Sequence, residues 1–215
     1  MNDPANSSFP TWLGKIIGEG VIQTIMQTVV EAYEQLAHSG TVKRSWDEQR
    51  ITKHLYIEID SFRTGYSEAT RSLGFDPFHE FPVYPKKNTG RPPSIDFVFR
   101  DEFDDERYFA FECKKVDFRR GRLAGRYVRD GIIRFCRGTY SSSMSVGGMI
   151  AYSFNGDPSL EVNAINARIC NTKGLGKGDE LRLERIWSGF KGAYASLHAR
   201  LFGGPFKIYH LILSF

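Results

Sequence analysis

Two short strand-like segments joined by a polar linker constrain the fold of this chain more than any other feature. In Ile95–Phe99 and Tyr108–Lys114, apolar residues recur at every second position. This is the period with which side chains alternate between the two faces of a β-strand. The linker Arg100–Arg107 is acidic and polar enough to form a hairpin loop. We therefore expect two neighbouring strands that pair antiparallel.

The same alternation predicts where the charged side chains of these strands point. Glu112 and Lys114 share one face of the second strand, and Asp96 points away from its apolar neighbours Ile95 and Phe97. Two carboxylates on one face supply oxygen ligands for Mg²⁺, and a nearby lysine orients or activates a water. For Glu112 and Lys114 the alternative is a surface cross-strand pair. For Asp96 it is a cap at a loop end, which fits poorly inside an apolar strand.

Asp96 followed by Glu112-Cys113-Lys114 resembles the signature of the PD-(D/E)XK nuclease superfamily, which includes many restriction enzymes. The resemblance implies a restriction-endonuclease-like α/β core, with a central mixed sheet flanked by helices. It also implies that Asp96 and Glu112 bind the metal ion and that Lys114 assists the attacking water. The proline of the signature, Pro93, lies three residues before Asp96 rather than next to it.

An earlier segment supplies a fourth candidate. In Trp46–Leu55, apolar residues follow Glu48 at helical spacing. Members of the superfamily often carry a further glutamate on such a helix, so the resemblance makes Glu48 a catalytic residue and a third metal ligand. Asp47 and Glu58 are the alternatives for this position, and a solvated helix face is the non-functional one.

Composition places the chain among ordinary globular proteins. Its 215 residues are 41% hydrophobic and 25% charged, which fits a domain with a substantial core. We expect residues 1–40 to form an N-terminal tail and helix, and residues 41–215 to form the nuclease-like domain. No apolar run is long enough for a membrane span, the N-terminus lacks the pattern of a signal peptide, and the three cysteines are widely spaced. These features predict a cytoplasmic protein.

Positive charge is concentrated just after the second motif strand. Between Lys114 and Arg137, nine lysines and arginines against Asp117 and Asp130 give a local net charge of +7, whereas the whole chain carries +4. Such a block beside a metal site suits a phosphate-backbone ligand, although charge runs are usually solvated helix faces. The loop Lys86–Arg91 adds further positive charge near Asp96. The candidates for nucleic-acid binding are Lys115, Arg119, Arg122, Arg126, Arg129 and Arg134.

Hydrophobic periodicity and turn residues predict the remaining elements. The order helix, hairpin, helix, strand, helix, strand is that of an α/β fold with a mixed sheet. Gly74–Gly90 contains three prolines and reads as an irregular loop with short extended pieces. Helices are expected over Gly20–His38, Ser45–Asp60, Gly121–Arg137, Pro158–Cys170 and Glu180–Trp187, and further strands over Val146–Phe154 and Pro205–Phe215.

Two other patterns are weaker candidates for chemistry. Gly174–Gly178 is rich in glycine but lacks the spacing of a phosphate-binding loop. Ser196, His198 and Arg200 stand at every second position. We interpret them either as phosphate contacts or as part of a solvated helix end. No serine lies in a Gly-x-Ser-x-Gly elbow, so the sequence gives no support for a serine hydrolase.

Together these features predict a Mg²⁺-dependent endonuclease, with Mn²⁺ as the alternative ion, that hydrolyses double-stranded DNA. The resemblance further implies a role in restriction or anti-phage defence, a homodimer that cuts both strands, and a partner defence protein. One alternative is a DNA-binding module that keeps the fold without hydrolysis. Another is an RNA-directed nuclease, because the metal chemistry does not distinguish the two sugars.

Overall fold

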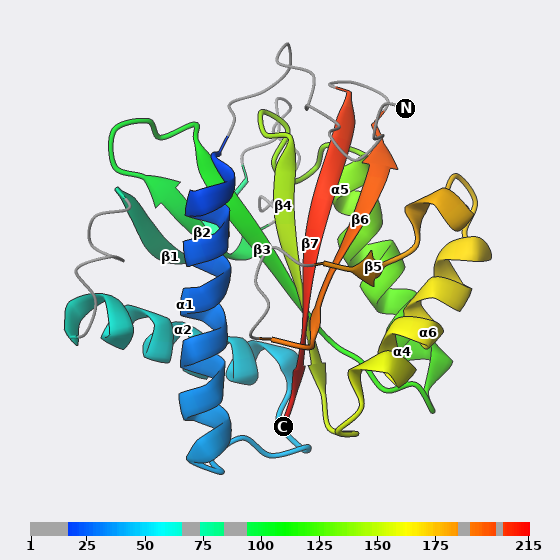
Figure 1. Ribbon diagram of the computed structural model, residues 1–215, viewed down its shortest axis with the longest axis horizontal. Coiled ribbons are helices and arrows are strands. Elements are labelled where there is room, and N and C mark those ends of the chain that lie inside the picture. Colours follow the sequence, from blue (N-terminus) through cyan, green and yellow to red (C-terminus); the bar gives the residue numbers. More distant parts are fainter. Residues whose placement is uncertain (1–16, 66–73, 84–93, 185–189, 201–203) are drawn as a thin grey trace, which may run out of the picture.

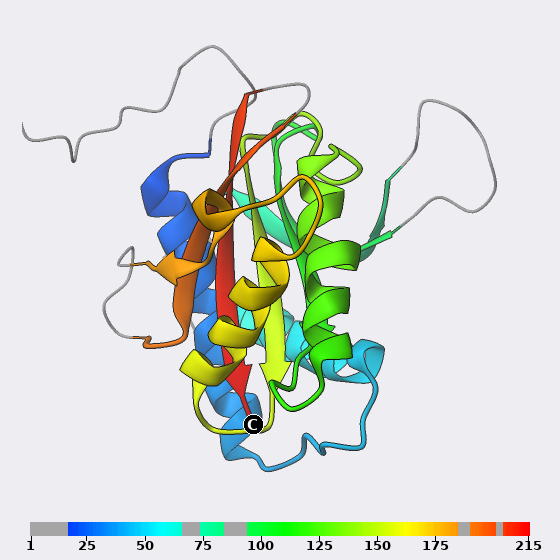
Figure 2. The same ribbon diagram turned by 90° about the vertical axis from the view of Figure 1, so that its right-hand side faces the viewer.

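The computed structural model describes residues 17–65, 74–83, 94–184, 190–200 and 204–215. These residues form one mixed β-sheet with helices on both of its faces, as Figures 1 and 2 show. The predicted α/β class with a central mixed sheet is therefore confirmed. Across the described ranges, no helix combines the length and the apolar character that crossing a membrane requires.

The strands of the described residues belong to a single sheet. In chain order they are β1 (Phe75–Pro82), β2 (Ser94–Asp101), β3 (Tyr108–Lys115), β4 (Val146–Ser153), β5 (Arg182–Leu183), β6 (Ala193–Ala199) and β7 (Pro205–Ser214). Their order across the sheet is β1-β2-β3-β4-β7-β6-β5. The β3–β4 and β4–β7 pairs are parallel, and the other neighbouring pairs are antiparallel. The predicted β2–β3 hairpin thus lies beside a parallel centre.

The helices divide between the two faces of this sheet. They are α1 (Glu19–His38), α2 (Glu48–Gly65), α4 (Gly121–Tyr127), α5 (Ile133–Cys136) and α6 (Pro158–Cys170), together with the π-helical turn η1 (Val128–Ile132) and the 3-10 turn η2 (Lys177–Asp179). Residues of α1 and α2 are buried in the core on one face, whereas α4, η1, α5 and α6 cover the other. The predicted helix over 121–137 is present, with η1 as a π-bulge in its middle.

Aromatic side chains dominate the core beneath α1 and α2. Phe97 and Phe111 stack across the β2–β3 pair with their ring centroids 4.9 Å apart. Ile25 and Val29 of α1 are fully buried in the same cluster. These contacts place α1 on the core of the same chain.

The opposite core contains one departure from the predicted strand alternation. Ile95 is buried with Val98 in the cluster beneath α4 and α6, rather than with Phe97 on the α1 side. The prediction that Ile95 and Phe97 share a face is therefore wrong. Strand β1 is distorted nearby, because Glu80 has a φ of 51° and leaves Asp96 without a register partner. The side-chain alternation of β2 is therefore interrupted at Asp96, although Ile95 still pairs with Phe81 of β1.

Several element boundaries also differ from those predicted. The second helix begins at Glu48 rather than near Ser45, because the Asp47 carboxylate accepts a 2.8 Å hydrogen bond from the Arg50 N–H and caps the helix there. Within Gly74–Gly90, residues Phe75–Pro82 form a strand of eight residues. Its prolines are tolerated because β1 is the edge of the sheet.

The C-terminal third was predicted least well. Arg182 and Leu183 form strand β5 against β6, where a helix over Glu180–Trp187 was predicted; residues 185–187 of that prediction lie outside the described residues. Ser196 and His198 lie on the buried side of β6 and not at a solvated helix end. Short strands and alternating small residues carry little periodic signal, which explains both errors.

Candidate active site

The predicted site forms where strands β2 and β3 separate. Their pairing ends at Phe97 opposite Phe111. Beyond that point the Asp96 side chain replaces the strand backbone, and its Oδ2 accepts a 2.6 Å hydrogen bond from the Cys113 N–H. The Asp96 carboxylate is therefore held against the free edge of β3, next to the residues of the Glu112-Cys113-Lys114 motif.

Two further side chains bind the same edge of β3. The Lys114 ammonium donates to Oε1 of Glu112 at 2.6 Å and to the carbonyl of Cys113 at 2.8 Å. Glu48 of α2 accepts a 2.9 Å bond from the Lys115 N–H through Oε2, and its Oε1 lies 3.3 Å from Lys114 Nζ. The structure thus brings together Glu48, Asp96, Glu112 and Lys114, which we call the carboxylate–lysine cluster.

Within the cluster, the carboxylate of Glu112 has the least favourable electrostatic environment. Its side chain is 3% exposed, and its buried Oε2 has no hydrogen-bond partner within the part of the chain that the structure describes. Burial, followed by the negative charge of Asp96, raises the pKa of Glu112 to about 7. The pKa of Asp96 is also raised by burial, against the opposing effects of Lys114 and the Cys113 N–H. An unpaired oxygen on a buried carboxylate costs free energy unless a ligand satisfies it.

Lys114 remains a cation in this environment. Burial acts to lower its pKa, but the combined charges of Glu112, Asp96 and Glu48 outweigh burial and raise the pKa above the ordinary value. An ammonium with three hydrogens and no acceptor can orient a water or neutralise a developing negative charge. It is not available as a general base.

Two arginines from the helix over 121–136 lie close to the carboxylates of the cluster. Arg126 lies 3.6 Å from Oε1 of Glu48, and Arg134 lies 3.7 Å from Oε1 of Glu112 while donating to the Tyr140 hydroxyl. Gly131 lies between them in η1, where a Cβ atom would come within 2.3 Å of Met149. The missing side chain therefore lets the helix pack closely over β4 and brings both guanidinium groups to the site.

The other predicted nucleic-acid contacts fall into different environments. Lys115 donates to the carbonyls of Arg44 and Trp46, so its ammonium joins β3 to the segment before α2. Arg129 makes a two-point contact with Asp130, whereas Arg119 and Arg122 are exposed. The predicted loop Lys86–Arg91 lies outside the described residues. Much of the +7 block is thus bonded within the protein, and the charge available to a ligand is smaller than the sequence suggested.

The donor set suits a hard divalent cation. Within the described ranges, no three or more His, Cys, Asp or Glu side chains gather as a metal-binding group, and Glu48 is engaged by Lys114 and the Lys115 N–H. Asp96 and Glu112 remain as a pair with one unpartnered oxygen. Mg²⁺ at phosphate-processing sites is held by one or two carboxylates together with water and phosphate oxygens. The pair therefore fits such an ion, while both oxygens of Glu48, the predicted third ligand, contact Lys114 or the Lys115 N–H.

Sequence reasoning missed a second polar constellation, on the other half of the sheet. Ser196 Oγ lies 2.6 Å from His198 Nε2 and 2.7 Å from His210 Nε2. The remaining nitrogen of His198 contacts Asp179 at 2.8 Å, and that of His210 contacts the Tyr127 hydroxyl at 2.9 Å. We call these five residues the serine–histidine chain. Reading 193–199 as a strand would have placed Ser196 and His198 on one face, but Asp179, His210 and Tyr127 are joined to them only by the tertiary fold.

Comparison with known proteins adds no family to this description. No protein-family model matches the chain, and no match is found among curated proteins or among solved structures. The geometry of the site and the motif residues themselves are therefore the basis for assigning a function.

Proposed function

We propose that this protein is a metal-dependent nuclease that hydrolyses DNA phosphodiester bonds at the carboxylate–lysine cluster. The observation that carries the proposal is the unpartnered Glu112 Oε2, buried beside the Asp96 carboxylate and within reach of a protonated Lys114. A structural ion pair has no need of a second buried carboxylate that raises the pKa of the first. A divalent cation held by both carboxylates would offset their repulsion.

Asp96 and Glu112 would hold the divalent ion, with Mg²⁺ favoured and Mn²⁺ as the alternative. When bound, the ion supplies a Lewis acid that polarises a phosphoryl oxygen and acidifies water. Asp96 is fixed by the Cys113 N–H, and Glu112 is fixed through Oε1 by Lys114. Each carboxylate therefore has one oxygen held by the protein, and the free Oε2 of Glu112 is the oxygen left for the ion.

Lys114 has a different role in this proposal. Because its pKa is raised, its ammonium stays charged and donates hydrogen bonds. It would orient the attacking water or stabilise the negative charge that develops on the phosphoryl oxygens. Glu48 positions this ammonium from α2 at 3.3 Å. We assign Glu48 to orientation of Lys114 rather than to the metal, unlike the role that the resemblance implies.

Substrate binding would use the basic surface next to the cluster. Arg119 and Arg122 are exposed on the segment that follows β3, and Arg126 and Arg134 reach the carboxylates from the same helix. Contacts of this kind hold a phosphate backbone without reading its sequence. The resemblance to PD-(D/E)XK enzymes favours DNA as the substrate and suggests a role in restriction or anti-phage defence.

The experiment is a cleavage assay with purified protein on plasmid, single-stranded DNA and RNA, in Mg²⁺ or EDTA. We expect plasmid cleavage that requires Mg²⁺ and is lost in Asp96→Asn. The exposed Asp105→Asn is the matched control, because Asp105 is 83% exposed, and it should cleave at the wild-type rate. Binding of DNA without cleavage in any metal would instead indicate a binding module. Cleavage of RNA alone would make the enzyme an RNA-directed nuclease.

A further inference from the structure

A hollow lined by both charged and apolar side chains opens beside the carboxylate–lysine cluster, at the carboxyl ends of β3 and β4. Its volume is about 370 Å³, near the lower end of the range for small-molecule sites, about 300–1,000 Å³. It is lined by Arg44, Ser45, Lys115, Val116, Asp117, Arg120, Leu123, Phe154 and Asn155. In open α/β sheets, the crevice at the carboxyl ends of the strands is the usual place for ligands.

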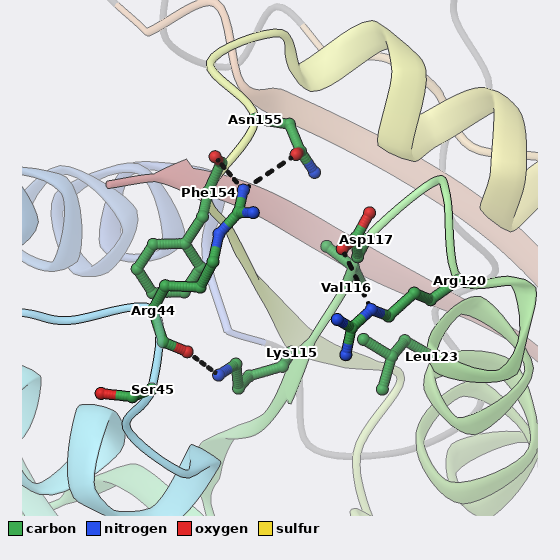
Figure 3. A pocket seen from close by; sticks show the side chains of 9 residues that line it. All are labelled: Arg44, Ser45, Lys115, Val116, Asp117, Arg120, Leu123, Phe154 and Asn155. Atoms are coloured by element: carbon green, nitrogen blue, oxygen red, sulfur yellow. Dashed lines mark hydrogen bonds and ion pairs between the residues drawn. The ribbon is translucent and has the colours of Figure 1, made fainter.

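The hollow carries excess positive charge. Figure 3 shows Arg44 and Arg120 flanking it. Arg44 donates to the Phe154 carbonyl at 2.7 Å, and Lys115 donates to two carbonyls, so these bonds satisfy hydrogens without neutralising charge. Asp117 is the only carboxylate among the lining residues, 3.7 Å from Arg120. Three cations therefore face one anion, which favours an anionic ligand.

Burial lowers the pKa of Lys115, although Glu48 and Asp47 oppose this shift more strongly than Arg120 and Arg44 add to it. The lining also includes apolar side chains, Val116, Leu123 and Phe154. A ligand with a phosphate and a flat or apolar body would match both parts of the hollow.

The hollow is adjacent to the cluster along the chain. Lys115 connects the two, because its N–H donates to Glu48 of the cluster and its side chain lines the hollow. Val116 and Asp117 follow directly, and an extended chain advances about 3.3 Å per residue. Val116 and Asp117 therefore lie within about 10 Å of Lys114, so that one substrate strand could reach both the cluster and the hollow.

We propose that this hollow binds one nucleotide of the substrate strand, with its phosphate held between Arg44 and Arg120 and its base or sugar against Leu123 and Phe154. The proposal rests on the proposed nuclease function and names the subsite that fixes the strand beside the cluster. Asn155 lies at the rim, where its amide oxygen already accepts from Arg44 at 3.2 Å.

Isothermal titration calorimetry in EDTA tests this without any cleavage. The probes are thymidine 5′-monophosphate, thymidine and inorganic phosphate, each added to the full-length protein. We expect the nucleotide to bind at least tenfold more tightly than either of the other two. Arg120→Gln should weaken nucleotide binding at least fivefold, and since the Arg120 side chain is 76% exposed, the fold should tolerate this change. The exposed Arg182→Gln on β5 removes the same charge elsewhere and should stay within twofold of wild type.

Three outcomes overturn the subsite. They are no binding of the nucleotide, equal binding of inorganic phosphate or thymidine, and wild-type affinity in Arg120→Gln. These results are separable from failure of the nuclease proposal. If plasmid is cleaved with Mg²⁺ but the nucleotide does not bind, only the subsite is wrong. If the nucleotide binds as expected to a protein that cleaves nothing, only the hydrolysis is wrong.

Discussion

The carboxylate–lysine cluster and the serine–histidine chain lie on the same sheet but differ in how completely their polar atoms are bonded. In the cluster, Glu112 Oε2 is buried without a partner in the described structure, and burial together with the negative charge of Asp96 raises the pKa of Glu112. In the serine–histidine chain, every ring nitrogen of His198 and His210 has a hydrogen-bond partner. The first arrangement stores unfavourable electrostatic energy that a ligand can relieve, and the second does not.

One assignment of hydrogens satisfies the whole serine–histidine chain. The Asp179 carboxylate accepts from His198 Nδ1, so His198 Nε2 accepts from the Ser196 hydroxyl. Ser196 then accepts from His210 Nε2, and His210 Nδ1 accepts from Tyr127. Burial lowers the pKa of both histidines, which keeps them neutral as this assignment requires.

The contrast shows that a hydrogen-bond pattern alone does not identify an active site. Asp179, His198 and Ser196 are connected in the order of a hydrolase triad. Ser196 is only 4% exposed, however, and its hydroxyl is engaged on both sides. The serine–histidine chain connects η2, β6, β7 and α4, and we interpret it as a structural network.

The largest expected effect separates the two regions by activity. Lys114→Ala removes the ammonium beside Glu112, and we expect Mg²⁺-dependent cleavage to fall by a factor of about 10² or more, with DNA binding largely retained. Ser196→Ala should cleave within twofold of wild type under conditions where both proteins are folded. Initial rates on plasmid, with binding measured in Ca²⁺, check the pair. A Ser196→Ala variant that folds but does not cleave would reverse our assignment of the two regions.

Ser196→Ala should lower the stability of the protein, although it has little effect on cleavage. Ser196→Ala leaves Nε2 of His198 and Nε2 of His210 without their shared partner, which costs roughly 2 kcal/mol. Urea denaturation should therefore give a lower midpoint with an unchanged slope. Ser142→Ala at an exposed position is the control, and its midpoint should match wild type. Equal midpoints for all three proteins would show that the serine–histidine chain contributes nothing to stability.

The two regions also predict opposite pH dependences. The folded pKa values of His198 and His210 are lowered, so unfolding takes up protons below about pH 6.5 and stability is lost as the pH falls. Glu112 has a folded pKa of about 7 against 4.5, so its contribution declines as the pH rises from 4.5 to 7. Each group changes stability by at most about 1.4 kcal/mol per pH unit.

Denaturation in EDTA at pH 7, 6 and 5 can resolve these opposing effects. Glu112→Gln should steepen the loss of stability on acidification, because it removes the compensating group. His210→Gln should make the loss shallower. Parallel curves for wild type and both variants would contradict the assigned pKa directions.

The smallest expected effect concerns the free-energy cost of burying the Glu112 carboxylate. At pH 8 in EDTA, Glu112→Gln removes a buried charge while keeping the shape of the side chain. Because the pKa of Glu112 is raised despite its contact with Lys114, its ionised form destabilises the fold. We expect the variant to be more stable by about 1 kcal/mol, measured by thermal or urea denaturation. Glu102→Gln, at an exposed position, should have no effect. A destabilised Glu112→Gln would mean that the carboxylate serves the fold rather than a ligand.

The carboxylate–lysine cluster was predictable because its geometry is mostly local. A hairpin with period-two alternation places Asp96, Glu112 and Lys114 together regardless of the rest of the fold. The turn at Ile95 was not predictable, since it depends on the distortion of β1 at Glu80. The serine–histidine chain was missed because its members come from four separate elements.

The arginine-rich helix shows the limit of reading charge from sequence. Its count of positive residues was correct, but which of them remain available depends on what the helix packs against. Arg126 and Arg134 are directed to Glu48 and Glu112 across the fold, and Arg129 is held by Asp130. The hollow at Arg44 and Arg120 was likewise not foreseen, because it joins the segment before α2 to the segment after β3.

The most direct test of the central claim is the rate of DNA hydrolysis by wild type and Glu112→Gln across a Mg²⁺ titration. We predict that the wild-type rate rises with Mg²⁺ and stops with EDTA, and that Glu112→Gln is slower by a factor of about 10² or more although at least as stable. Wild-type activity in Glu112→Gln, or no hydrolysis of any nucleic acid by the wild-type protein, would contradict the claim.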